Sequence, residues 1–424
     1  MKCGVIHPNK PPWVCSPCWL IMTLKSRLSQ LQAQAGATPT GVPSVQPQVA
    51  ASLQNRLGHL RPERLQGRTT SPQNKLSVEA LAQAVKGEVI SEGLIRIEAC
   101  LPLNGELGIR SLNGLRDIPL LPGETEVIPG VYIDTETTGL SGGSGTLAFL
   151  AGMAVIEASH LKLTQWLITC FAAESALLCA LEQAIPASHR LISYNGKSYD
   201  APLLLTRFRL LGLPTSVGTR EHLDLLHPVR RLFSKRWDDC RLVTLERQLL
   251  GFERKDDLPG SEAPEAWFSY LRHGNARQLI RVVEHNRQDI LSLAVAHATL
   301  AEAIADPLRH KADLYGLARW LSEVNEPKAL ALLQSHQDRL CADSSRLLAH
   351  LFRRTERWMA AVPIWEALAK QGCVESIERL AKYHEHISKD LQVAWQYCAQ
   401  LPGSTADRHR QKRLQEKLKK KTAC

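Results

Sequence analysis

The sequence has no apolar run that approaches the roughly 20 residues of a membrane-spanning helix. The most apolar stretch near its start, Trp13–Met22, is short and is interrupted by Pro17. That stretch also lacks a clean small-residue cleavage site, which makes it a poor secretory signal. We therefore expect a protein with no membrane partner.

A second Cys-x-x-Cys pair is also missing. The pair formed by Cys15 and Cys18 has the spacing of half a zinc site, with Cys3 and His7 nearby. Without a second pair no complete tetrahedral site is visible, and a simpler interpretation is that Met22 is the natural start. The 11 cysteines are scattered along 424 residues rather than arranged as a disulfide framework. We expect reduced thiols in a cytoplasmic protein.

Positive charge is in excess, with 52 Lys and Arg against 42 Asp and Glu, a formal net charge of +10 and a pI near 9.1. This balance favours a polyanionic partner such as nucleic acid. Residues 219–275 interleave cations with Phe233 and Trp237, which suits a strand of nucleic acid, and a long solvated face is the alternative. The cations are Arg220, Arg230, Arg231, Lys235, Arg236, Arg241, Arg247, Arg254 and Lys255.

The chain length allows two or three domains, and composition divides it into four segments. Residues 1–75 are rich in Gln, Ala, Pro and Ser and predict a flexible, basic N-terminal arm. Residues 76–130 predict a helix and short strands, a small extension packed on the next domain. Residues 131–305 have an α/β pattern. Residues 310–424 are helical, with a weak repeat of roughly 32 residues, near the tetratricopeptide period, and a basic tail.

The α/β segment predicts three strands and then helix, strand and helix. These elements are expected at 131–134, 147–156, 161–169, 173–184, 190–193 and 201–211, and a long helix is expected at 276–304. This order resembles that of a ribonuclease H-like mixed sheet, which begins as an antiparallel meander and ends in parallel crossovers. The glycine-rich Ser141–Thr146 is expected to connect the first two strands, with an anion-binding nest as the alternative.

Two carboxylates, Asp134 and Glu136, end the first of these strands. Residues i and i+2 of a strand project to the same face, so the two side chains point the same way. Like charges side by side raise each other's pKa unless a cation lies between them. A divalent metal explains the pair, and a solvated acidic turn is the alternative.

Two further acidic positions follow along the chain. Asp200 comes after Asn195 and Tyr199, and Asp289 lies one helical turn after His285. Four converging acids need cations, and two Mg²⁺ or Mn²⁺ ions would form with them a cage that activates water against a phosphodiester. Histidine, with an ordinary pKa of about 6.5, suits a general base on that water.

These motifs resemble the DEDD exonucleases of the ribonuclease H-like superfamily. The first motif is Asp134-x-Glu136 with Thr-Thr-Gly-Leu, the second is Asn195-x-x-x-Tyr-Asp200, and the third is His285-Asn-Arg-Gln-Asp289. The longer runs, among them Leu258-Pro-Gly-Ser-Glu262, are similar to the YprB-like branch. The resemblance covers about residues 130–305.

The resemblance implies metal-dependent hydrolysis of DNA or RNA that releases nucleotides from the 3′ end. It implies Asp134, Glu136, Asp200 and Asp289 as ligands of two ions, with His285 as the base. In the family the histidine usually stands five residues before the last aspartate, whereas here it stands four before. The alternative function is a scaffold that binds nucleic acid without turnover and recruits a protein partner through its helical repeats.

Overall fold

The computed structural model describes residues 76–139, 145–255 and 257–422. The predicted arm at 1–75, with Cys3, Cys15, Cys18 and Met22, lies outside the described residues, as does most of the glycine-rich loop.

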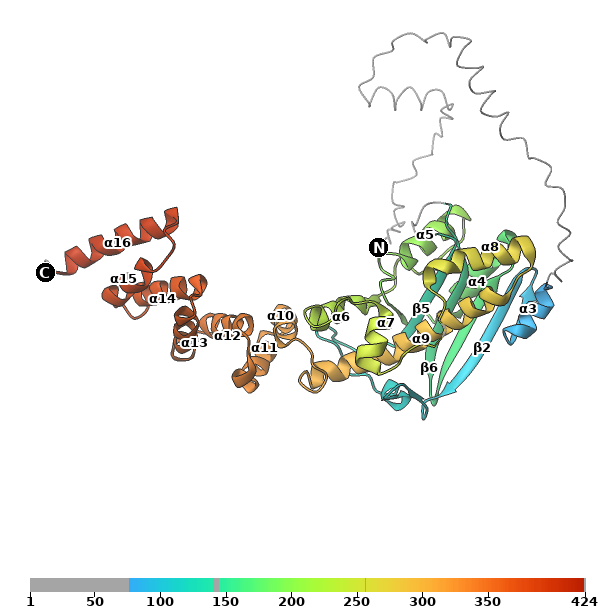
Figure 1. The fold of residues 1–424 in the computed structure, drawn as a ribbon, viewed down its shortest axis with the longest axis horizontal. Helices are drawn as coiled ribbons and strands as arrows, with labels where there is room; N and C mark the ends of the chain where they lie inside the picture. The colour runs from blue at the N-terminus through green and yellow to red at the C-terminus, as the bar shows by residue number, and fades with distance from the viewer. Residues whose placement is uncertain (1–75, 140–144, 256, 423–424) are drawn as a thin grey trace, which may run out of the picture. The chain divides into compact units, whose positions relative to one another are not determined.

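A seven-stranded mixed sheet forms the centre of the α/β segment (Figure 1). Its order is β1-β2-β7-β6-β5-β8-β9. Neighbouring strands are antiparallel from β1 to β5, and β8 and β9 run parallel to β5, which confirms the predicted mixed sheet. The strands are β1 (Gly87–Ser91), β2 (Leu94–Pro102), β5 (Gly130–Thr137), β6 (Ala148–Glu157), β7 (His160–Ile168), β8 (Arg190–Ser193) and β9 (His222–Asp224).

Helices cover the sheet, and the longest of them, α9 (Arg277–Ala305), lies along it (Figure 1). The others in this part are α3 (Val78–Ala84), α4 (Glu174–Ala184), α5 (Asp200–Leu210), α6 (Leu226–Phe233), α7 (Leu242–Leu245) and α8 (Ala263–His273). A short hairpin, β3 (Glu106–Leu107) and β4 (Arg110–Ser111), precedes a 3₁₀ turn at Leu112–Leu115, and a π-helical turn, Glu246–Leu250, follows α7.

Strand β5 and helix α9 run antiparallel and in contact. The hydroxyl of Tyr132 lies 3.1 Å from Nδ1 of His297, near the start of β5 and late in α9. Two residues further along β5, Asn286 of α9 donates a hydrogen bond of 2.7 Å from Nδ2 to Oδ2 of Asp134. Because alternate residues of a strand share a face, the face that carries Asp134 and Glu136 is the one that α9 covers.

A glycine allows this close approach. Gly152 of β6 is paired with Asp134, and a Cβ at Gly152 would lie 2.3 Å from Oδ1 of Asn286 and 2.3 Å from Cδ1 of Ile290. Gln165 of β7 donates a 2.8 Å bond to Oδ1 of Asn286, so that this buried amide is held from both sides. The packing of α9 on the sheet therefore fixes the position of the Asn286 amide that binds Asp134 of β5.

The segment before β5 contributes to the same sheet. Strand β2 pairs with β7 over nine residues from Leu94 to Pro102, and β1 adds the edge strand. The described residues after position 75 form one compact unit, and residues 76–130 build part of the α/β layer. The boundary at 131 stays a prediction.

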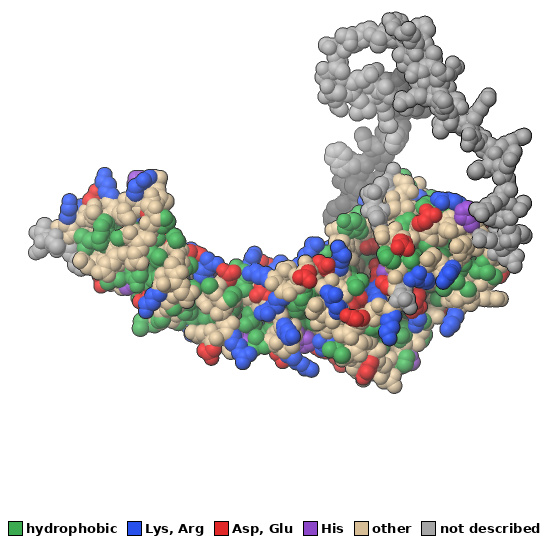
Figure 2. Space-filling view, in the orientation of Figure 1, with side chains coloured by type: hydrophobic (Ala, Val, Ile, Leu, Met, Phe, Trp, Pro, Cys, Tyr) green, Lys and Arg blue, Asp and Glu red, His purple; other side chains and the backbone are tan. Residues whose placement is uncertain are grey.

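Helix pairs follow the α/β part, and Figure 2 shows basic and acidic side chains interspersed over them on the visible face. They are α10 (Leu314–Val324) with α11 (Glu326–Ser335), α12 (Ala342–Arg354) with α13 (Trp358–Lys370), and α14 (Val374–His386) with α15 (Leu391–Ala399). Two series of residues follow the predicted spacing of roughly 32 residues: Ala318, Ala349 and Ala381 form one, and Ala329, Ala361 and Val393 form the other. All five alanines are buried. In α15, Val393 is half-buried and its neighbour Ala394 is buried.

The basic tail forms a helix, α16 (Thr405–Thr422), that is tied to α14. Glu385 of α14 is buried, and it accepts hydrogen bonds of 2.7 Å from Arg413 and 2.8 Å from Lys417. Two of the positive charges of the tail, those of Arg413 and Lys417, are thus paired with a carboxylate of the protein itself. Across the described ranges, no helix is both long and apolar enough to cross a membrane.

Candidate active site

The acids of the first motif lie within β5, which continues to Thr137. The predicted alternative of a solvated acidic turn is therefore wrong, because Glu136 is only 8% exposed and Asp134 is half-buried. Asp200 is the first residue of α5, and its Oδ1 accepts a hydrogen bond from the hydroxyl of Thr135 in β5. Asp289 comes from α9.

The four carboxyl groups act on one another electrostatically. Burial raises the pKa of Asp134 well above its usual range, and the charges of Asp289, Asp200 and Glu136 raise it further. Burial, Asp289 and Asp200 raise the pKa of Glu136 to about 8. Burial also raises the pKa of Asp200, against the effect of the Thr135 hydrogen bond. Three separate elements thus bring the predicted acids to one place.

Protein donors occupy several of these carboxylates. Asn286 binds Asp134, Thr135 binds Asp200, and the guanidinium of Arg254 donates to Oδ1 of Asp289. Within the described part of the chain, no group of three or more His, Cys, Asp or Glu side chains is arranged to hold a metal ion.

Arg254 was not among the predicted site residues. Its side chain is only 6% exposed and makes two bonds of 2.7 Å to the fully buried Glu246, as well as a 3.1 Å ion pair with Asp257. Burial lowers the pKa of Arg254, but the hydrogen bonds and charges of Glu246 and Asp289 outweigh burial and raise it overall. The predicted use of this cation in a surface for nucleic acid is therefore wrong. The guanidinium of Arg220 likewise donates hydrogen bonds to backbone carbonyls of the protein, including that of Pro186 at 2.6 Å.

The second missed residue is Asp257, which holds the histidine of the third motif. Nδ1 of His285 lies 2.7 Å from Oδ1 of Asp257 and 3.2 Å from Nη1 of Arg254. Nε2, the other ring nitrogen, lies 3.5 Å from Oδ2 of Asp289 and 3.9 Å from Oε1 of Glu136. Burial would raise the pKa of Asp257, but the hydrogen bond and charge of His285 lower it overall. With Nδ1 held by Asp257, Nε2 faces the acids.

The second motif forms a turn that Asp224 shapes from the end of β9. The carboxylate of Asp224 accepts from the backbone N–H of Asn195 at 2.7 Å and of Lys197 at 3.1 Å. Asn195 adopts a left-handed backbone with φ of 68°, a conformation that Asn tolerates better than most residues. This turn delivers Asp200 to the site, whereas the side chain of Tyr199 is 61% exposed.

The chemistry of the donor set fits a hard divalent cation. All four predicted ligands are carboxylates, the donors that Mg²⁺ and Mn²⁺ prefer. The raised pKa values of Asp134 and Glu136 reflect an excess of negative charge, which Arg254 offsets at Asp289 and, in part, at Glu136. A bound cation would neutralise that excess charge. To bind it, the carboxylates would exchange hydrogen bonds from Asn286, Thr135 and Arg254 for bonds to the ion.

Three comparisons place the chain among known proteins. The family model described as RNase_H superfamily matches residues 131–301, which hold all four acids and His285. The uncharacterized protein YprB of Bacillus subtilis (strain 168) is 34% identical over 286 residues, which are 63% of this chain and 68% of YprB.

A solved structure, the family B DNA polymerase of the archaeon Pyrobaculum calidifontis, is similar at 12% identity and a TM-score of 0.33. That match covers 66% of this chain and 36% of the polymerase. The family match is consistent with the seven-stranded mixed sheet. The chain therefore belongs to the RNase H superfamily and is a relative of YprB.

Proposed function

We propose that the protein is a metal-dependent nuclease, specifically a 3′–5′ exonuclease that hydrolyses phosphodiester bonds of DNA or RNA with two divalent ions. The observation that carries the proposal is the meeting of Asp134, Glu136, Asp200 and Asp289 from β5, α5 and α9. Thr135, between the first two acids, bonds Asp200, and Nε2 of His285 lies 3.9 Å from Glu136 and 3.5 Å from Asp289. Such crowding of acids has a cost in stability that a structural role does not require.

Each acid has a role in the proposed reaction. Asp134, Glu136, Asp200 and Asp289 would hold Mg²⁺ or Mn²⁺, and Glu136 would also orient the attacking water. Bound divalent ions would supply Lewis-acid activation of that water and stabilise the leaving oxygen. His285 would accept the proton of the water at Nε2, the ring nitrogen that faces Glu136 and Asp289. Asp257 would hold the opposite nitrogen and fix the tautomer.

One observation favours the alternative function, a scaffold without turnover. Arg254 neutralises Asp289 in the place where a cation is expected to act. Because Arg254 also pairs with Glu246 and Asp257, it keeps partners if Asp289 turns away toward a metal. We therefore retain the nuclease as the function, with Arg254 as the charge that stabilises the acids until ions bind.

The test is digestion of end-labelled single- and double-stranded DNA and RNA by the purified protein with Mg²⁺, Mn²⁺ or EDTA. With a 5′ label we expect a ladder that shortens from the 3′ end, and with a 3′ label we expect immediate release of a labelled mononucleotide. Loss of a ligand removes several kcal/mol of charge stabilisation, so Asp134→Asn should be slower by at least about 100-fold.

Asp117→Asn is the matched control, because Asp117 is an exposed aspartate outside the site. Equal digestion by the wild type and Asp134→Asn would show that the assigned site is wrong. Absence of digestion of every substrate with either ion would support the scaffold.

A further inference from the structure

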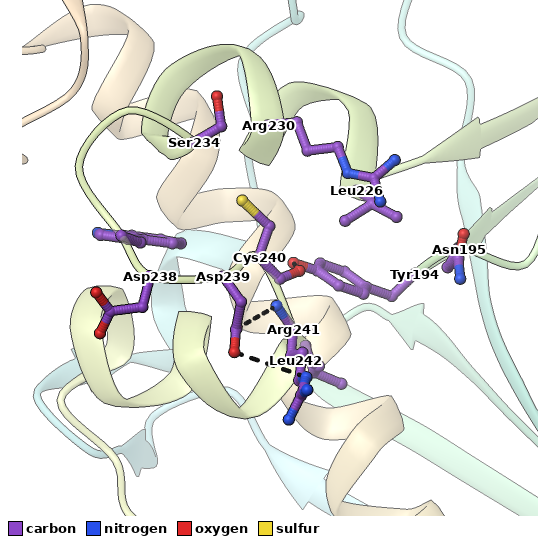
Figure 3. Close-up of a pocket in the computed structure, with 11 residues that line it drawn as sticks. Tyr194, Asn195, Leu226, Arg230, Ser234, Asp238, Asp239, Cys240, Arg241 and Leu242 are labelled. Carbon is purple, nitrogen blue, oxygen red and sulfur yellow. Dashed lines mark hydrogen bonds and ion pairs between the residues drawn. The ribbon is translucent and has the colours of Figure 1, made fainter.

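A pocket of about 680 Å³ lies beside the second motif, and the proposed roles above do not use it. Its walls come from the Tyr194–Asn195 segment, from α6 and from the loop that leads into α7. Figure 3 shows Arg230 and Arg241 on opposite sides of the pocket, with Tyr194 pointing from the Asn195 side toward Cys240.

Asp224 joins this pocket to the candidate active site. Its carboxylate binds the backbone of Asn195, which lines the pocket and begins the turn to Asp200. The same carboxylate accepts a 3.1 Å bond from the N–H of Leu226, which also lines the pocket and begins α6. A ligand in the pocket would therefore lie next to the turn that delivers Asp200.

An aromatic platform forms part of the wall. Trp237 is partly exposed in the pocket, and its ring stacks on the fully buried Phe233, with centroids 4.2 Å apart and planes 5° apart. The hydroxyl of Tyr194 donates a 2.7 Å bond to the carbonyl of Cys240, which holds the adjoining wall. An indole fixed in this way is suited to stack on a flat ring, such as a nucleobase.

The charged side chains that line the pocket differ in how many hydrogen bonds and ion pairs they make within the protein. Asp239 accepts 2.5 Å and 3.0 Å bonds from Thr244 and from the N–H of Arg241. Arg230 is exposed, and its side chain makes no hydrogen bond or ion pair with another described residue. Arg230 is thus the cation that stays available to a ligand's phosphate.

A second pocket of about 330 Å³ continues the first, because Arg230 and Ser234 line both. It lies between α6 and α10, where Nζ of Lys235 stands 4.3 Å from the ring centroid of Tyr315. The exposed Arg319 on its α10 side also makes no side-chain bond to another residue that the structure describes. Cations and aromatic rings therefore follow one another from the second motif to the first repeat helix.

We infer that the pocket at Trp237 is a binding site for an unstacked base of single-stranded nucleic acid, and that the strand continues past Arg230 toward Arg319. This inference rests on the proposed function, since it makes the pocket a subsite of the same active site. The occupant is single-stranded because the bases of a duplex are already stacked on one another and cannot enter a pocket that offers an aromatic face.

The test measures binding by fluorescence anisotropy in EDTA, with a labelled single-stranded oligonucleotide and the matching duplex as probes. Base–aromatic stacking is lost in Trp237→Leu, so we expect single-strand affinity to fall by about 10-fold or more, with Trp237→Phe within about twofold of the wild type. Arg230→Gln should weaken binding and lower the slope of log affinity against log salt by about one. Duplex affinity should stay unchanged in Trp237→Leu.

Arg277→Gln is the matched control, because Arg277 is an exposed arginine at the start of α9, away from both pockets. Circular dichroism melting identifies any variant that fails to fold, and Trp237→Phe keeps the test valid in that case. Wild-type single-strand affinity in Trp237→Leu, or an equal loss for the duplex, would overturn the inference.

Cleavage of p-nitrophenyl thymidine 5′-monophosphate separates this inference from the proposed function. This small substrate reaches the acids without a long strand, so pocket variants should keep its cleavage while they lose digestion of oligonucleotides. If the wild type cleaves neither substrate but single-strand binding depends on Trp237, the nuclease proposal fails and the binding site stands.

Discussion

Nδ1 of His285 lies 2.7 Å from Oδ1 of Asp257, and the opposite ring nitrogen faces Asp289. Asp257 belongs to the loop before α8, whereas His285 belongs to α9. A carboxylate in this position fixes the tautomer that leaves Nε2 free to accept a proton, and it stabilises the imidazolium that results.

Asp257→Asn should therefore slow digestion by at least about 10-fold, because general-base catalysis contributes roughly 100- to 10,000-fold and depends on the correct tautomer. Single-turnover rates on a labelled oligonucleotide measure the effect. Glu253→Gln, at an exposed acid of the same loop, serves as control. A wild-type rate in Asp257→Asn would remove this pair from the mechanism.

The buried Glu246–Arg254 pair gives a prediction about stability. Arg254→Met leaves Glu246, which is 0% exposed, without its cation, so the free energy of unfolding should fall by about 3–5 kcal/mol. Glu246→Leu combined with Arg254→Met removes both charges and should recover part of that loss. Urea denaturation measures both changes.

Arg272→Met is the control for that series, because Arg272 forms an exposed ion pair with Glu265 and should change the unfolding free energy by less than about 1 kcal/mol. If Arg254→Met is no less stable than this control, the ion pair does not stabilise the fold as we infer.

Gly152 links the packing of the fold to the site. Gly152→Ala would push on Asn286 and Ile290, destabilise the protein by about 1–3 kcal/mol and move the amide that binds Asp134. Since small displacements of catalytic groups are costly, we expect digestion to slow by roughly 10- to 100-fold. At Gly114 a Cβ meets only ordinary contacts, so Gly114→Ala should leave the rate unchanged. Equal rates in the two variants would contradict the expected role of Gly152.

His297 gives a prediction about pH. Burial, together with the charge of Arg190, lowers its pKa from about 6.5 to about 3. The folded state keeps His297 neutral while the unfolded state becomes protonated, so this contribution to stability is complete above pH 6.5 and is lost as pH falls toward 3. The slope is about 1.4 kcal/mol per pH unit.

Between pH 7.5 and pH 5 the stability advantage of the wild type over His297→Gln should therefore shrink by about 2 kcal/mol in urea denaturation. The exposed His273 is the control, and His273→Gln should show no such change. A constant difference between the wild type and His297→Gln would mean that His297 titrates alike in both states.

The sequence predicts the sheet and the four acids because their signals are local. The alternation around Asp134, the turn before Asp200 and the helical spacing of Asp289 each lie within a few residues. Strand β9 is missed because three residues are too short for a periodic signal, although its Asp224 shapes the turn that delivers Asp200.

Arg254 and Asp257 show what the sequence cannot supply. In the sequence Arg254 is one of many cations between residues 219 and 275, and nothing there distinguishes it from a surface residue. Only the fold reveals that Arg254 is buried against Glu246 and Asp289. In the same way, Asp257 lies in a loop, and its partner His285 lies 28 residues away on α9. The sequence predicts a weak repeat of roughly 32 residues, and Ala318, Ala349 and Ala381, which follow that spacing, are all buried.

The most direct test of the proposed cation site is the number of Mn²⁺ ions bound, counted by electron paramagnetic resonance. We expect the wild type to bind two ions and Asp134→Asn to lose at least one of them, while the control Asp117→Asn binds two. A wild type that binds no Mn²⁺, or an Asp134→Asn variant that binds the same number as the wild type, would contradict the assignment of these carboxylates as metal ligands.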